Sequence, residues 1–158
     1  MKLIVCVDDR MGVMFNRRRQ SKDINVRKDI LSMVEEGKKL FVSPYTANQF
    51  LLEEQERLYV SENFLLEAGE EDICFIEDKN ALEVEHNIET IILYRWNRHY
   101  PSDKYFQIDL CAYELVSSMD FVGNSHPEML KEEYKKKLDM ETSDLEEVTK
   151  EEVANETY

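Results

Sequence analysis

Short apolar runs alternate with helical patterns along the amino-terminal half of the chain. The run Leu3 to Val7 is rich in β-branched residues, which predicts a strand buried on both faces at the centre of a sheet. Apolar residues then recur at helical spacing over residues 22–36, with Ser21 as a helix cap and Gly37 as a left-handed exit. A second run, Leu40 to Val42, completes a strand-helix-strand unit, which we expect to be right-handed with parallel strands.

The alternation continues to residue 94. The expected elements are a helix over 45–54 that Pro44 begins, a short helix through 64–66 that Ser61 caps, strands over 73–76 and 90–94, and a weakly helical acidic stretch from residue 81. Strands that alternate with helices in this way predict a parallel sheet with helices on its faces.

The last third of the chain has a different pattern. Residues 105–108 and 113–118 alternate apolar and polar side chains, which predicts antiparallel strands at one edge of the sheet. Pro127 is expected to begin a final helix, whose apolar face consists of Leu130, Tyr134 and Leu138. The predicted fold is a three-layer α/β domain with a mixed, mostly parallel sheet and an antiparallel C-terminal edge.

Charge divides the chain into a domain and a tail. Residues 139–158 contain eight acids against Lys150, a charge of −7 out of a total of −14, and we expect them to be a flexible acidic tail behind a single domain over residues 1–138. Residues 10–28 contain seven basic residues against Asp23, a charge of +6, so a local anionic ligand is compatible with the sequence and so is a solvated basic loop.

The composition excludes several classes of protein. The total charge argues against broad nucleic-acid binding, and the absence of a long apolar run argues against a membrane protein. No signal-peptide pattern precedes the first strand, so we expect a cytoplasmic protein. Cys6, Cys74 and Cys111 are predicted to be buried free thiols, and the three histidines lack the paired spacing of a zinc site.

Candidate chemistry lies where the predicted parallel strands end, because ligands of open α/β sheets bind at that edge. Asp8 and Asp9 follow the first strand, and Glu77 and Asp78 follow the third. With Arg95 and Arg98 on a phosphate, these four carboxylates are compatible with Mg²⁺-dependent phosphoester hydrolysis. Acids at strand ends are also common turn formers, and no Walker A loop or phosphatase motif accompanies these, so we expect no metal site.

Several segments in order resemble dihydrofolate reductase. The segments are Val7 to Gly12, similar to the family's first strand and glycine loop; Leu40 to Thr46, similar to its Gly-Arg-x-Thr strand; Ile73 to Arg95; Ser102 to Phe106, similar to its Gly-Asp-x-x-Phe; and Tyr113 to Val116. The resemblance covers about residues 1–120 and implies the dihydrofolate reductase fold. It also places Asp23 at the position of the family's single buried acid, near the start of the first helix.

The resemblance implies a catalytic or ligand-binding role for Asp23, which can bind a planar amidine-like edge and help to protonate a ring. An acid in the first helical turn is equally explained by the helix dipole. The other ligand-binding candidates are Val7, Asp8, Gly12, Arg17, Arg18, Arg19, Ser43, Thr46, Glu77, Asp78 and Arg95.

The sequence departs from the family where the family binds its cofactor. Glu77 and Asp78 stand in place of a Gly-Gly pair, and two carboxylates there repel the pyrophosphate of NADPH. Pro44 replaces the arginine for the 2′-phosphate, residues 51–60 replace a longer segment that contains another strand and the adenosine site, and residues 15–19 replace the Pro-Trp of the substrate loop. These departures argue against ordinary NADPH binding.

Three hypotheses follow. The first is a divergent protein of this fold that binds a pterin-like or nucleotide-like ligand near Asp23 and Thr46, either as a reductase or without activity. The second is a non-catalytic regulatory protein that binds partners through its basic loop and acidic tail. The third is the Mg²⁺-dependent hydrolase. Trp96 is expected to pack in the core, and His126 to cap the last helix.

Overall fold

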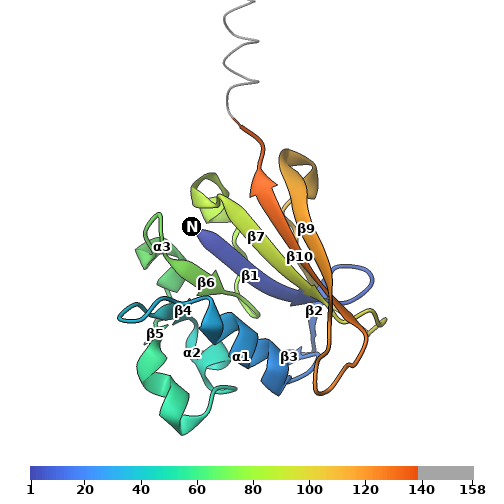
Figure 1. Cartoon of the computed structure of the whole chain (residues 1–158), viewed down its shortest axis with the longest axis horizontal. Helices are drawn as coiled ribbons and strands as arrows, with labels where there is room; N and C mark the ends of the chain where they lie inside the picture. Colours follow the sequence, from blue (N-terminus) through green and yellow to red (C-terminus); the bar gives the residue numbers. More distant parts are fainter. Residues whose placement is uncertain (139–158) are drawn as a thin grey trace, which may run out of the picture.

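The computed structural model describes residues 1–138, and the predicted tail over 139–158 lies outside this range. Its main element is a seven-stranded sheet in the order β5-β4-β6-β1-β7-β10-β9 (Figure 1). The central strand β1, Lys2–Val7, pairs in parallel with β6, Ile73–Phe75, and with β7, Thr90–Arg95. Leu3, Ile4, Val5 and Val7 are fully buried, as expected for a strand covered on both faces.

The two halves of the sheet differ in direction. On one side β4, Leu40–Val42, and β5, Leu58–Val60, continue the parallel sheet. On the other side β10, Met129–Lys136, pairs antiparallel with both β7 and β9, Tyr113–Phe121. The prediction of a mostly parallel sheet with an antiparallel C-terminal edge is confirmed.

Helical segments cover both faces of the sheet, which confirms the three layers. Alternate residues of β1 point to opposite faces. Ile4 packs in one core with α1, Ile24–Ser32, and with Ala47 of α2, Pro44–Ala47. Leu3 and Val5 pack in the other core with α3, Phe64–Glu67, and the 3₁₀ segment η2, Leu82–Asn87. Two further 3₁₀ segments are η1, Leu52–Arg57, and η3, Leu110–Ala112.

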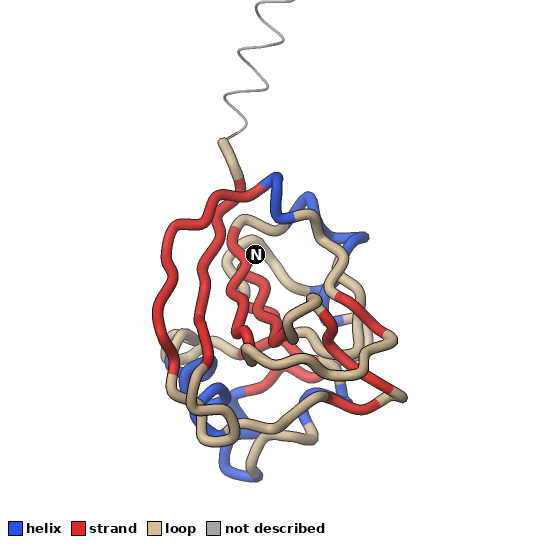
Figure 2. The backbone as a smooth tube through the Cα atoms, turned by 90° about the vertical axis from the view of Figure 1, so that its right-hand side faces the viewer, coloured by secondary structure: helices blue, strands red, loops and turns tan. Residues whose placement is uncertain are grey.

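A small three-stranded sheet lies beyond the carboxyl end of β1. It consists of β2, Gly12–Phe15, between β3, Arg18–Arg19, and β8, Lys104–Tyr105 (Figure 2). Asn16 and Arg17 form the two-residue turn between β2 and β3, with φ of 51° and 62°. Two positive φ angles are typical of a tight hairpin turn that follows the twist of its strands.

The first helix is shorter than the apolar pattern predicts. Asp23, not Ser21, is its cap, because the Asp23 side chain accepts a hydrogen bond from the N–H of Val26. The helix ends at Ser32, and Arg57 of η1 donates to the carbonyl oxygens of Leu31, in its last turn, and of Val34, just beyond it. The predicted helix over 45–54 likewise consists of one turn, α2, followed by non-helical residues and η1.

The predicted helix after Pro127 is wrong, because this segment is strand β10. Leu130 and Tyr134 are four residues apart, a spacing that one face of a strand shares with a helix. The segment fills the space between two strands, β7 and β9, and hydrogen bonds to both outweigh the helix propensity of its lysines and glutamates. His126 therefore caps no helix.

Three smaller expectations also change. The strand predicted over 105–108 is only the short β8, Lys104–Tyr105. The segment 51–60, which was expected to lack a strand, contains β5. Cys74 is buried and Cys6 partly so, whereas Cys111 is exposed and therefore not a core thiol. Within residues 1–138 no helix is long and apolar enough to span a membrane.

Candidate functional site

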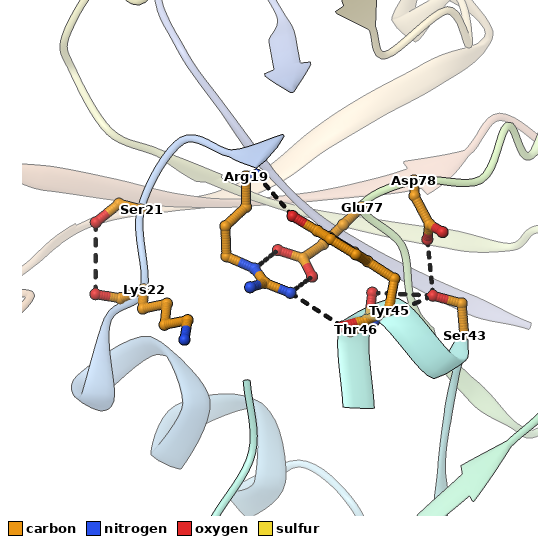
Figure 3. A network of polar contacts seen from close by, with 8 residues as sticks. All are labelled: Arg19, Ser21, Lys22, Ser43, Tyr45, Thr46, Glu77 and Asp78. Carbon is orange, nitrogen blue, oxygen red and sulfur yellow. Dashed lines mark hydrogen bonds and ion pairs between the residues drawn. The ribbon is translucent and has the colours of Figure 1, made fainter. Parts of the chain in front are cut away.

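An arginine and a glutamate occupy the middle of the sheet edge where β1 and β6 end (Figure 3). Arg19 of β3 donates from Nε to Glu77 Oε2 at 3.0 Å and from Nη2 to Glu77 Oε1 at 3.2 Å. The two side chains are only 13% and 10% exposed. Burial raises the pKa of the Glu77 carboxyl, and the Arg19 guanidinium opposes this rise. The sequence placed both residues among the candidates, and the structure shows that they bind each other.

Tyr45, at the start of α2, holds the arginine in this position. The guanidinium of Arg19 lies 4.3 Å from the centre of the Tyr45 ring, and its Nη2 donates to the Tyr45 carbonyl at 3.1 Å. The Arg19 backbone N–H donates to the Tyr45 hydroxyl at 2.8 Å. Stacking on an aromatic ring and a two-point contact with a carboxylate together fix a guanidinium in one orientation.

Ser43 joins the ends of β4 and β6. Its hydroxyl donates to Asp78 Oδ1 at 2.7 Å and accepts the Thr46 N–H at 3.2 Å, so that it caps α2 (Figure 3). Lys104 of β8 donates to the Asp78 carbonyl at 2.9 Å. Ser43, Thr46 and Asp78 therefore form a hydrogen-bonded network beside the Arg19–Glu77 pair.

Val13, Ile76 and Glu77 separate two cavities at this edge, because all three line both. The cavity on the α1 side, which Asp23 and Trp96 also line, measures about 10 Å³, room for a single water molecule. The cavity on the η2 side measures about 340 Å³. Only the larger of these two has the volume of a small-molecule site, roughly 300–1,000 Å³.

The small cavity has polar groups without partners. Gln20 Oε1, Gln49 Nε2 and Trp96 Nε1 are buried and have no hydrogen-bond partner within residues 1–138. Trp96 is 4% exposed and packs on the ring of His126, with the ring centres 4.6 Å apart, in agreement with its expected core position. Each unpaired buried group costs about 1–3 kcal/mol, so a polar molecule the size of water fits this cavity better than an empty space does.

Asp23 is 2% exposed, and other parts of the protein already bind it. Its Oδ1 accepts the Val26 N–H at 3.0 Å, and its Oδ2 accepts both the N–H of Ser125 at 2.8 Å and the hydroxyl of Ser125 at 2.7 Å. Burial opposes ionisation, but these hydrogen bonds lower the pKa of the Asp23 carboxyl overall. A ligand that binds Asp23 Oδ2 must therefore compete with Ser125.

Asp8 organises the loop that follows β1. It is 1% exposed, and its carboxylate accepts N–H groups from Arg10, Gly12 and Tyr100 at 2.7 to 3.0 Å. No side chain fits at Gly12, because a Cβ there would lie 2.0 Å from the hydroxyl oxygen of Ser102. Both residues thus have a structural role at the edge of the site.

The four acids of the magnesium hypothesis do not converge. Asp8 binds its own loop, Asp9 is exposed on that loop, Glu77 binds Arg19 and Asp78 binds Ser43. Within residues 1–138 no group of three or more His, Cys, Asp or Glu residues is arranged to hold a metal ion.

The other candidates lie around the cleft rather than in it. Val7 is fully buried in the core, Arg17 and Arg18 are exposed on the hairpin, and Arg95 pairs with Glu132 of β10. Sequence reasoning missed Tyr45 and Gln49, which lie one position before and three after Thr46 and so follow a residue that was identified. It also missed Ser125, for which the sequence holds no signal.

Comparisons with known proteins identify the architecture. No family model matches the sequence, and neither does any curated protein. Among solved structures, dihydrofolate reductase from Enterococcus faecalis complexed with NADP(H) and RAB-propyl matches with a TM-score of 0.62 over 87% of this chain and 96% of that one. The chain has the dihydrofolate reductase fold. The sequence identity of 14% fits a divergent protein, and the likeness extends to the fold alone.

Proposed function

We propose that this dihydrofolate reductase-like protein binds a small nucleotide-like ligand in the 340 Å³ cavity and does not use NADPH as a hydride donor. The observation that carries the proposal is the Arg19–Glu77 pair, which fills the centre of the cleft. It leaves room for one water on the Asp23 side and for a small molecule on the other. This favours the nucleotide-like ligand of the first hypothesis over the pterin-like one.

The lining of the larger cavity fits a ring with polar substituents. Its floor is apolar and buried, from Val5, Ile76, Ala81, Phe106 and Ile108. Its rim is polar and includes the side chains of Asn80 and Gln107, which hydrogen-bond to each other at 3.0 Å, and Lys104. A flat apolar ring can lie on such a floor while amide and ammonium groups bind its sugar or carbonyl oxygens.

A whole dinucleotide fits this cleft poorly. Asp78 and Glu77 lie where the family resemblance places the cofactor's pyrophosphate, and a negative charge there opposes binding. Binding along the cleft also requires the buried Arg19–Glu77 pair to separate, and breaking a buried ion pair costs about 3–5 kcal/mol.

Calorimetric titration with nucleosides, mononucleotides, pterins, dihydrofolate and NADPH tests the proposal. We expect binding of a nucleoside or mononucleotide, loss of that binding in Ala81→Leu, which fills the cavity floor, and unchanged binding in Leu82→Met, at the exposed neighbouring position. NADPH oxidation coupled to dihydrofolate, or ligand binding that survives Ala81→Leu, would contradict it. Thermal unfolding of Ala81→Leu, compared with that of the wild type, separates lost binding from lost folding.

A second candidate function follows from unpaired arginines. Arg10, Arg17, Arg18 and Arg98 are exposed, and none has a carboxylate oxygen within 4.0 Å in the described part of the chain. Arg10 and Arg98 lie in the loops that follow β1 and β7, and Arg17 and Arg18 lie in the β2–β3 hairpin beyond the carboxyl end of β1. A basic edge on an acidic protein favours binding of an acidic protein segment there. Binding of a polyglutamate peptide that weakens with salt and in Arg17→Ser/Arg18→Ser would support this function, and salt-independent binding would oppose it.

A further inference from the structure

A loop between β9 and β10, residues 122–128, is fastened over Asp23 by hydrogen bonds. Besides the two bonds from Ser125, the Asn25 side chain donates to the Val122 carbonyl at 3.0 Å, and Asn124 Oδ1 accepts the Ile24 N–H. Gly123 is in such close contact that a Cβ there would lie 2.5 Å from Asp23 Oδ2. The loop therefore closes the Asp23 side of the cleft.

His126 extends this hydrogen-bond network from Ser125 to Tyr100. His126 Nδ1 lies 2.7 Å from the Ser125 hydroxyl, and its Nε2 lies 2.6 Å from the Tyr100 hydroxyl. The single hydroxyl proton of Ser125 goes to the Asp23 carboxylate, so Nδ1 carries a proton and donates to Ser125. Nε2 then accepts a hydrogen bond from the Tyr100 hydroxyl, so the neutral imidazole forms a hydrogen bond with each of these two hydroxyl groups.

A second proton on His126 disturbs this arrangement. Nε2–H would point at the Tyr100 hydroxyl, which must turn its own proton away, and the new charge would be buried in a side chain that is 8% exposed. The guanidinium of Arg98, stacked 5.1 Å from the centre of the Tyr100 ring, repels the charge.

The other ionisable groups around His126 do not reverse this balance. Asp23, the cap of α1, attracts a positive charge on the ring. Asp8, at the end of β1, is bound to the Tyr100 N–H, and His99 lies 3.9 Å from Asp8, whereas Glu128 on the loop itself is exposed. Burial and then Arg98 lower the pKa of His126 against the attraction of Asp23.

We propose that loop 122–128 is a pH-sensitive cover of Asp23, which stays closed while His126 is neutral and opens when His126 is protonated. The closed state lowers the affinity of His126 for a proton, so closure is complete above the ordinary pKa of histidine, about 6.5, and is lost as the pH falls below it. Opening exposes Asp23 and joins its small cavity to solvent. The inference concerns the Asp23 side of the cleft and does not depend on what binds in the larger cavity.

Amide hydrogen exchange on the full chain tests the cover. Protection of residues 122–128, corrected for the intrinsic pH dependence of exchange, is compared at about pH 8 and about pH 5. We expect protection of this segment to fall about tenfold on acidification, while β4 and β6 keep theirs. Equal protection of the loop at both pH values would overturn the proposal.

Two variants separate the cover from general acid effects. His126→Gln keeps a neutral polar group and should abolish the pH dependence of the loop, so the same fall in this variant would refute a role for His126. Tyr100→Phe removes the donor to Nε2, and opening should then begin at higher pH. A transition that stays at the wild-type pH in Tyr100→Phe would also count against the mechanism. Each variant is first compared with wild type by its thermal unfolding at about pH 8.

Discussion

Replacing Arg19 with Met should destabilise the protein strongly, and more so at high pH. The substitution leaves the buried Glu77 carboxylate without its two-point partner and also removes the stacking on Tyr45. Breaking a buried ion pair typically costs about 3–5 kcal/mol. Because both side chains retain about a tenth of their exposure, we expect the lower end, about 3 kcal/mol of the free energy of unfolding at pH 8.

The pH dependence follows from Glu77 in the variant. Without the guanidinium, burial raises the pKa of Glu77 further, so the folded variant keeps a proton that the unfolded chain gives up. The stability of the variant is therefore highest below the unfolded pKa of about 4.3 and falls as the pH rises through the folded pKa of Glu77. In the wild type the Arg19 guanidinium opposes the rise in the pKa of Glu77, so the stability of the wild type should depend less on pH. The loss relative to wild type should shrink to about 1 kcal/mol near pH 5.

Urea unfolding followed by the fluorescence of Trp96, the single tryptophan, measures both effects. Arg18→Met is the matched control, because this neighbouring arginine is exposed and has no carboxylate partner within residues 1–138, and its effect should stay within about 0.5 kcal/mol. A loss below about 1 kcal/mol in Arg19→Met at pH 8, or a loss that does not change with pH, would show that the pair is not a buried ion pair.

Two further predictions concern single contacts. Gly12→Ala should destabilise by about 2 kcal/mol or more, because its Cβ would lie 2.0 Å from the Ser102 hydroxyl oxygen; an unchanged midpoint of thermal unfolding would contradict the close contact. Arg57→Ala should cost about 1–2 kcal/mol in urea unfolding, since the carbonyls of Leu31 and Val34 lose their partly buried donor, and Arg57→Lys should recover only part of this loss.

Most of the parallel half of the sheet was predictable from the sequence for a physical reason, although its edge strand β5 was missed. Strands buried on both faces must be apolar throughout, so β1, β4, β6 and β7 are visible as short apolar runs. Strand β10 was not, because its exposed and half-buried side chains are mostly lysine and glutamate. Its conformation comes from hydrogen bonds to strands that are far away in sequence.

The site shows the same division between local and distant information. The sequence identified Arg19 and Glu77 separately, from their positions in a basic loop and at a strand end. Their contact joins residues 58 positions apart and depends on where the β2–β3 hairpin folds back over the sheet edge. The role of Asp23 as an anchor for Ser125 depends on a separation of 102 positions, which no local pattern reveals.

The position of Glu77 has a consequence for how this protein can evolve. A single side chain is part of the wall between a cavity that admits one water and a cavity that admits a small molecule. A smaller residue there, together with a shorter side chain at position 19, would remove the polar part of this wall and leave Val13 and Ile76 as its remaining members. The range of ligands open to this scaffold thus depends on two side chains, one in a short strand and one in a loop, that lie outside the buried strands at the centre of the sheet.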